Sequence, residues 1–339
     1  MSAAWLLCLP KPETSFSGRE FSEAFAALLC LPSPSCAGRV GEQIVGRIKV
    51  CKWGDEVVNA KMRGDGLRTR HDAVKLKIKG LLGWAGIPAV CEVFNLFASS
   101  IPQAGLSRIE RGRRRQGLVP DFKLRGEEQE GDILCELKCM SASNSRYPRN
   151  PQPRDGKRAV DRRAEGLTED YRRKAKEVDW QYCGTPRPPP RLRGAPEPPR
   201  QIGPVEQRLL TFGQVRGWVF GAWGEASTAV HCLVQRLAKA KQEVAPTQPR
   251  QHGPARSREG ELAGLVGYVR RVLSFTAVQQ QARLLLDRLQ LLGDGATEAA
   301  RRRDMAVNLE RRAVRERRAQ AVSLQQGRNI QRSGFGKLD

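Results

Sequence analysis

The sequence predicts an α/β fold built around a small mixed sheet. Short runs rich in β-branched and aromatic residues predict strands, and longer segments with apolar residues at helical spacing predict helices. Between Thr69 and Ala240 these segments follow one another in the order helix, strand, strand, strand, helix, strand, helix. This order is typical of an α/β core. The 339 residues suffice for one large or two modest domains.

Composition shifts divide the chain into four parts. The predicted parts are an N-terminal segment at 1–66, a core at 67–242 with a Pro- and Arg-rich insert at 185–204, a linker at 243–260 and a basic helical extension at 261–339. Residues 19–31 of the first part predict a helix, because Phe21, Phe25 and Leu28 share one face. The rest of that part mixes glycine with charge and predicts no definite element.

The core is predicted to begin with a helix whose N-cap is Thr69. A strand is expected at residues 89–98 and a loop at residues 99–117. Two further strands flank the acidic turn in residues 118–140, LVPDFKLRGEEQEGDILCELKCM. The later predictions are helices at 157–180 and 205–210, a strand at 215–223, and helices at 227–240, 261–292 and 297–326.

The charge of the chain predicts a polyanionic partner. Lys and Arg total 59 against 36 for Asp and Glu, a formal net charge of +23. DNA or RNA is the expected partner, because basic side chains that neutralise phosphates release counterions. The side chains expected to contact phosphates include Arg113, Arg114, Arg115, Arg172, Arg173 and Lys174. Arginine runs are also typical of a solvated helix face, most clearly at 301–318, where glutamates interleave.

The sequence gives little reason to expect a membrane or a disulfide framework. No apolar run of about 18 residues occurs, so no membrane-spanning helix is expected. Nine scattered cysteines without a CxxC pair predict buried reduced thiols in an intracellular protein. No small-molecule cofactor is expected.

Two carboxylates and an ammonium are predicted to meet on the paired strands of residues 118–140. Alternate residues of a strand face the same side, so Glu136 and Lys138 share one face, and Asp121 can reach it from the preceding strand. Such a cluster needs a partner, and the hard oxygen ligands of carboxylates suit Mg²⁺. The alternative is a surface hairpin with ordinary alternating charges.

Pro120-Asp121 followed by Glu136-Leu137-Lys138, in this order of elements, resembles the PD-(D/E)XK nuclease superfamily. The resemblance implies a restriction-endonuclease-like core of helix, three strands, helix and strand. It also implies a DNA endonuclease that uses Mg²⁺ or Mn²⁺. Asp121 and Glu136 would hold the metal and Lys138 would assist the attacking water. The family often adds an acid, for which Asp72 and Glu92 are both candidates. A supporting polar residue from the later helix would be Asp170, Tyr171 or Lys174.

A closer resemblance is to the restriction-like endonuclease of site-specific non-LTR retrotransposons. There an Arg-His-Asn or Arg-His-Asp opens the first helix, matched here by Arg70-His71-Asp72. This match places Arg70 and His71 among the expected nucleic-acid contacts, with Asp72 as a further catalytic acid. It implies descent from a mobile element and a nuclear location. No reverse-transcriptase signature accompanies it.

Those relatives carry a zinc knuckle upstream of the nuclease, and here its pattern is degraded. Glu56 stands where the family has His, and Ala60 where it has Cys, which leaves Cys36 and Cys51. A structural zinc site needs about four nitrogen or sulfur ligands, so no zinc is expected. The loss also keeps open a catalytically inactive, nuclease-like nucleic-acid-binding protein. A third function, a helical scaffold, is suggested by the long helices expected after Glu261.

Overall fold

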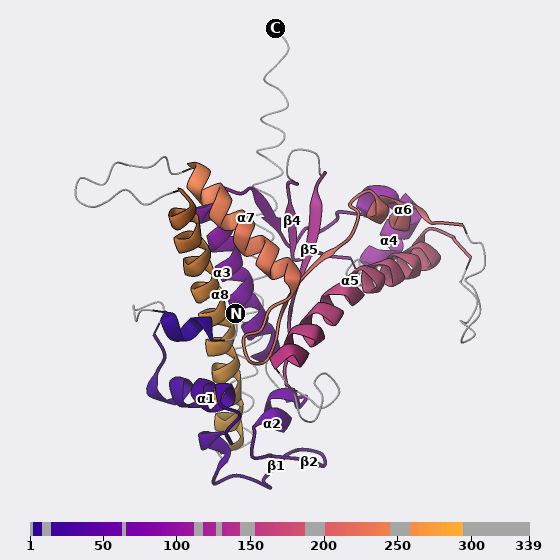
Figure 1. Cartoon of the computed structure of the whole chain (residues 1–339). Helices are drawn as coiled ribbons and strands as arrows, with labels where there is room; N and C mark the ends of the chain where they lie inside the picture. Colours follow the sequence, from indigo (N-terminus) through magenta and orange to yellow (C-terminus); the bar gives the residue numbers. More distant parts are fainter. Residues whose placement is uncertain are drawn as a thin grey trace.

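The protein forms an α/β structure in which helices cover both faces of a mixed sheet (Figure 1). A computed structural model describes residues 3–8, 15–62, 66–111, 118–126, 131–142, 153–186, 201–244 and 258–293. The predicted α/β class and the order of helix, strand, strand, strand, helix, strand, helix are both found in these residues, with additional short helices in the two longer connections.

The sheet has four strands in the order β3-β4-β5-β6. The strands are β3 (Ala89–Cys91), β4 (Phe122–Leu124), β5 (Ile133–Cys139) and β6 (Arg216–Phe220). The first three pair in antiparallel fashion, whereas β5 and β6 are parallel. A parallel pair needs a long crossover, and the helical segment between β5 and β6 supplies it. Strand β5 is therefore central and has neighbours on both sides.

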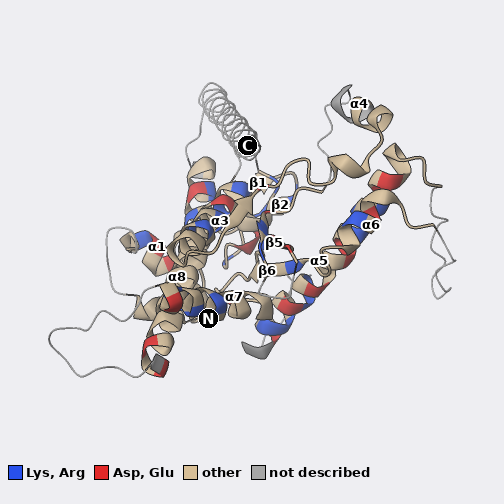
Figure 2. Cartoon of the chain, turned by 90° about the horizontal axis from the view of Figure 1, so that it is seen from above, with Lys and Arg blue, Asp and Glu red and all other residues tan. Residues whose placement is uncertain are grey.

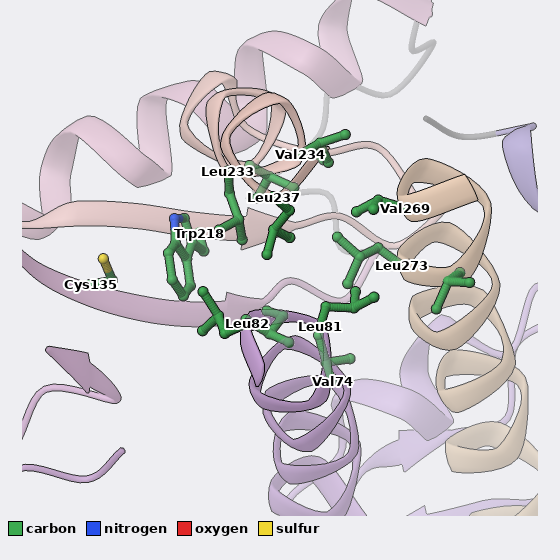
Figure 3. Close-up of a cluster of buried hydrophobic side chains, with 14 of the residues drawn as sticks. Val74, Leu81, Leu82, Cys135, Trp218, Leu233, Val234, Leu237, Val269 and Leu273 are labelled. Carbon is green, nitrogen blue, oxygen red and sulfur yellow. The ribbon is translucent and has the colours of Figure 1, made fainter. Parts of the chain in front are cut away.

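One face of the sheet carries the main apolar core. Helices α3 (Gly66–Trp84), α7 (Thr228–Val244) and α8 (Arg258–Gly293) pack there. Figure 3 shows side chains of all three helices converging beside Trp218 of β6. Removing these apolar side chains from water is the main stabilising contribution to this layer. Because α8 supplies Val269 and Leu273 to the same cluster, it belongs to this layer of the fold.

The other face is covered by α5 (Pro153–Tyr182), with α4 (Gln103–Arg111) and α6 (Pro204–Leu210) near its end (Figure 1). Gly217 of β6 lets α5 approach closely, because a Cβ there would lie 2.6 Å from the Cα of Ala164. The buried carboxylate of Asp179 accepts hydrogen bonds from the backbone N–H groups of Val205 and Glu206, each at 2.9 Å. It caps the first turn of α6 and ties the end of the insert back to α5.

The N-terminal elements pack along α8. They are η1 (Ala4–Leu7), α1 (Gly18–Leu28), η3 (Pro34–Cys36), the hairpin of β1 (Gln43–Val45) and β2 (Ile48–Lys49), and α2 (Asp55–Asn59). Arg288 of α8 is buried, and its Nη1 donates to the carbonyls of Val57, Val58 and Ala60 at 2.7–2.9 Å. These bonds satisfy carbonyls at the C-terminal end of α2. Helix α8 thus joins the N-terminal segment to the core.

Two predicted boundaries and one predicted loop were wrong. The first core helix begins at Gly66 and not at Thr69. The strand expected at 89–98 stops at Cys91, because Glu92 and Asn95 have left-handed backbones with φ of 48° and 63°. The expected loop at 99–117 contains η4 (Ala98–Ser100) and α4.

The sequence pattern predicted a loop in the segment that forms α4. The helix forms there because tertiary packing stabilises it. Gly105 lies against the end of α5, and a Cβ there would be 2.4 Å from the carbonyl oxygen of Tyr182. Leu106 packs on the cluster around Tyr171. The other predicted helices and the strand at 215–223 are found within a few residues of their expected ends. The predicted helix at 297–326 lies outside the described residues.

Candidate active site

The carboxylate of Asp121 is fixed at the centre of the site by backbone and side-chain donors. Asp121 directly precedes β4 and is 9% exposed. Its Oδ2 accepts a hydrogen bond from the backbone N–H of Leu137 at 2.9 Å. Leu137 stands between Glu136 and Lys138 on β5. The bond therefore places Asp121 beside the pair that the sequence predicted to share its face.

Glu136 is held by residues of two elements. Its Oε2 accepts a hydrogen bond from the hydroxyl of Tyr171 on α5 at 2.6 Å, and its Oε1 is paired with the ammonium of Lys138. The side chain of Glu136 is 8% exposed and that of Lys138 is 37% exposed. Lys138 therefore lies where the site meets solvent. Tyr171, a candidate from the family pattern, reaches the site through this bond.

His71 and Asp72 begin a second group of side chains, on α3. His71 Nε2 lies 3.2 Å from Asp121 Oδ2, and its Nδ1 lies 3.3 Å from Asp72 Oδ1. The imidazole thus bridges the two carboxylates. Asp72 is also within 3.6 Å of both Arg68 and Lys75. His71 therefore lies between Asp72 and Asp121. The role of Asp72 as a further catalytic acid stays a prediction.

Lys75 is a member of the site that the sequence analysis missed. Its ammonium lies 2.6 Å from Glu92 Oε1, 3.5 Å from Asp121 Oδ1 and 3.6 Å from Asp72 Oδ1. The helical spacing could have revealed it, because Lys75 follows His71 by four residues and so shares its face. The carboxylate of Glu92, the other candidate acid, contacts the site through Lys75, and its backbone N–H donates to the carbonyl of Asp121.

The network shifts the pKa values of its members in mutually consistent directions. Burial alone would lower the pKa of His71, but its hydrogen bonds with Asp121 and Asp72 outweigh burial and raise the pKa to about 9. Burial would raise the pKa of Asp121, but the bond and charge of His71 and the charge of Lys75 lower it. At neutral pH the site therefore contains ionised Asp121 against a protonated His71. Burial, and after it the charge of Glu136, raise the pKa of Tyr171, which keeps its hydroxyl a donor.

Arg70 is a correction to the expected nucleic-acid contacts. Its side chain is buried at 1% exposure. The guanidinium donates to the carbonyls of Met140 at 2.9 Å and Gly221 at 3.4 Å, and to the hydroxyl of Ser141 at 3.3 Å. A group enclosed in this way cannot reach a phosphate. Arg70 instead links α3 to the segments that follow β5 and β6.

The other expected contacts lie on α5 or outside the described residues. Arg172 pairs with Glu169 at 2.9 Å and Arg173 with Asp170 at 2.6 Å. Basic and acidic residues alternate along α5 (Figure 2), so much of this charge is locally balanced. Lys174 is exposed, with its ammonium 5.5 Å from the centroid of the Tyr171 ring. Arg113, Arg114 and Arg115 lie outside the described residues.

The residues of the site fit a magnesium ion by the chemistry of their donors. Asp121 and Glu136 are hard oxygen donors, each held in place by protein hydrogen bonds. Among the described residues, no group of three or more His, Cys, Asp or Glu side chains is arranged to hold a metal. Two carboxylates nevertheless suffice for Mg²⁺, which keeps several waters and takes further oxygens from a substrate phosphate.

The region of the degraded zinc knuckle is packed against α8. Cys36 is buried, and burial, with smaller contributions from Glu23 and Cys51, raises the pKa of its thiol. Cys36 shares an apolar cluster with Val57, Val58 and three leucines of α8. Side-chain packing and the Arg288 bonds therefore hold this region to the core.

Comparison with protein-family models, curated proteins and solved structures finds no match to this chain. None of the described helices combines the length and the apolar character needed to cross a membrane.

Proposed function

We propose that the protein is a Mg²⁺-dependent endonuclease that hydrolyses phosphodiester bonds of DNA. The observation that carries the proposal is the hydrogen bond from Leu137 N–H to Asp121, which brings two carboxylates and Lys138 together. The same arrangement underlies the resemblance to the PD-(D/E)XK superfamily. The proposal includes three further expectations for this protein: a restriction-endonuclease-like core, descent from a mobile element and a nuclear location.

The residues of the site have distinct proposed roles. Asp121 and Glu136 would hold Mg²⁺ or Mn²⁺, which when bound polarises the phosphoryl oxygen and lowers the pKa of a coordinated water. Tyr171 orients Glu136 through its hydroxyl. Lys138, at the solvent-facing side, stabilises negative charge that develops on the phosphate during attack.

Net charge supports a nucleic-acid substrate. A chain with a formal charge of +23 attracts polyanions over a long range, and the attraction weakens with salt. Half-exposed Lys138 pairs with Glu136, and exposed Lys174 lies over the ring of Tyr171, whose hydroxyl donates to Glu136. A phosphate backbone would pass along this side of the site. The other expected phosphate contacts, Arg172 and Arg173, lie on the same helix as Lys174.

One observation favours a second candidate, a nucleic-acid-binding protein without catalysis. His71 and Lys75 pair with the two oxygens of Asp121, at 3.2 Å from Oδ2 and 3.5 Å from Oδ1. A site whose carboxylate is already neutralised by protein cations can persist without metal. This candidate predicts salt-dependent DNA binding and no metal-dependent cleavage.

The test is nicking of supercoiled plasmid by the purified full-length protein with Mg²⁺. We expect Asp121→Asn and Lys138→Met each to lower the nicking rate by about 100-fold or more, as for loss of a group that acts on transition-state charge. Lys239→Met is the matched control, because Lys239 is an exposed lysine of α7, a helix that contributes no residue to the candidate active site. Equal nicking by native, Asp121→Asn and Lys138→Met proteins would overturn the site assignment. Binding without any nicking would favour the second candidate.

A further inference from the structure

Lys75 is the most highly connected cation of the candidate active site. Its ammonium is close to three carboxylates: Glu92 at 2.6 Å, Asp121 at 3.5 Å and Asp72 at 3.6 Å. Its side chain is 11% exposed, whereas that of Lys138 is 37% exposed. A buried ammonium is costly unless ionised partners surround it. Lys75 is therefore a fixed positive charge within the site.

Glu92 holds Lys75 away from a full contact with Asp121. The shortest bond of the ammonium goes to Glu92, and the distance to Asp121 is 0.9 Å longer (3.5 against 2.6 Å). Glu92 is itself held by its backbone N–H, which donates to the carbonyl of Asp121 at 2.9 Å. The left-handed backbone at Glu92 costs conformational energy, so this placement of its carboxylate is maintained by the surrounding structure.

A cation that binds Asp121 must share the carboxylate with Lys75. Oδ2 already accepts from Leu137 N–H and faces His71, so Oδ1 is the oxygen on the Lys75 side. A divalent ion beside Oδ1 would be repelled by an ammonium at this distance, and the repulsion is strong in a site that excludes bulk water.

We propose that Lys75 is a positioning residue that sets the metal affinity of Asp121, and that Glu92 restrains Lys75. The proposal rests on the proposed function, since it concerns the same metal site. Lys75 keeps Asp121 ionised and in place before an ion arrives and competes with the ion for the carboxylate. Glu92 weakens this competition by drawing the ammonium toward itself.

The two residues therefore affect metal affinity in opposite directions. Replacing Lys75 by Met removes the competing charge and should strengthen binding. Replacing Glu92 by Gln removes the tether and a negative charge, so the ammonium moves against Asp121 and binding should weaken. Once Lys75 is absent the tether has nothing to hold, so Glu92→Gln should then have little further effect.

The experiment measures Mn²⁺ binding by the full-length protein at neutral pH, by calorimetry and by the loss of the free-ion electron paramagnetic resonance signal. We expect Lys75→Met to bind about 5-fold more tightly than the native protein and Glu92→Gln about 5-fold more weakly. The double variant should match Lys75→Met within about 2-fold, which is a coupling that additive effects cannot produce. Lys75→Arg keeps the charge and should bind within about 2-fold of the native protein.

Two controls separate this inference from a general loss of structure. Lys77→Met removes a lysine from the same helix outside the ion-pair network and should leave affinity unchanged, with thermal unfolding confirming that each variant folds. Asp121→Asn should abolish binding.

The outcomes distinguish the inference from the proposed function. Unchanged or weaker binding by Lys75→Met overturns the inference alone. If the double variant binds as weakly as Glu92→Gln, Glu92 ligates the metal and does not act through Lys75, which also overturns it. If neither the native protein nor Lys75→Met binds Mn²⁺, the inference and the metal-dependent function both fail.

Discussion

Asp121 Oδ2 accepts a hydrogen bond from the backbone N–H of Leu137, although 16 residues separate the two in the chain. The bond joins the residue before β4 to the middle of β5, one position after Glu136. Every residue except proline keeps this backbone donor, so the bond can fix the carboxylate whatever other residue stands at 137. The geometry of the candidate active site is in this respect a property of the sheet register.

The bridging His71 predicts a pH dependence of stability. The pKa of His71 is raised from 6.5 to about 9 in the folded protein. Because its pKa is raised on folding, protonated His71 contributes to the free energy of unfolding. This contribution is fully present below pH about 6.5 and is lost as pH rises through about 9. The side chain is 22% exposed, and we expect the contribution to be about 2 kcal/mol. The measurement is the free energy of unfolding by urea between pH 6 and pH 9.5.

His71→Gln is the comparison for this prediction, because glutamine keeps a polar side chain that does not titrate. The native protein should be more stable than His71→Gln at pH 6, and the difference should shrink by pH 9.5. Thiols and other groups titrate in both proteins, so their contributions to the free energy of unfolding cancel in this difference. A gap that stays constant or widens with rising pH would contradict the protonated bridge.

The bond from Tyr171 to Glu136 predicts a stability effect of Tyr171→Phe. The change removes the hydroxyl that donates to Glu136 Oε2. Because the side chain of Glu136 is only 8% exposed, water cannot readily replace this donor. We expect a loss of about 1–2 kcal/mol, because bonds to charged groups exceed the average hydrogen bond. Urea unfolding measures it. Tyr182→Phe, on the same helix, is the control and should change stability by less than about 0.5 kcal/mol.

The central strands and the Asp121, Glu136 and Lys138 cluster could be predicted because they depend on local periodicity. Alternation along β5 is enough to place Glu136 and Lys138 on one face, and their ion pair agrees with it. Helix α5 likewise has an apolar stripe that identifies it without any tertiary information. Its Tyr171 could be named as a candidate, but its bond to Glu136 depends on how α5 crosses the sheet.

Arg70, α4 and α8 could not be predicted in the same way because tertiary contacts decide their roles. Arg70 follows Thr69 in a polar sequence, yet its buried guanidinium donates to two separate chain segments, at Met140-Ser141 and at Gly221. The position of α4 depends on contact with the end of α5. Helix α8 was expected in a basic extension, but its apolar face completes the main core and binds the N-terminal segment.

Two glycines predict opposite effects of the same substitution. Gly217→Ala would place a Cβ 2.6 Å from the Cα of Ala164, so α5 would have to move from the sheet. We expect a loss of about 2–3 kcal/mol. Gly166 lies inside α5 with its nearest neighbour at 3.9 Å, so Gly166→Ala should stabilise by about 0.5–1 kcal/mol through helix propensity.

Thermal and urea unfolding of both glycine variants measure the difference. Equal effects, or a gain in stability for Gly217→Ala, would mean that α5 does not lie against β6 as described. The pair is informative because each variant adds the same single methyl group.

Arg70 and Lys174 should separate stability from nucleic-acid binding. Arg70→Ala leaves carbonyls of Met140 and Gly221 without their guanidinium donor and creates a cavity. We expect it to lower the free energy of unfolding by about 3 kcal/mol. Lys174→Ala removes an exposed charge and should change stability by less than about 0.5 kcal/mol.

DNA binding should depend on Lys174 and not on Arg70. If Lys174 contacts a phosphate, Lys174→Ala weakens binding about equally across sequences and lowers the slope of log affinity against log salt by about 1. The folded fraction of Arg70→Ala should keep the native salt slope, since a buried guanidinium neutralises no phosphate. A reduced slope for Arg70→Ala with native stability would instead place Arg70 at the DNA, as the sequence resemblance implied.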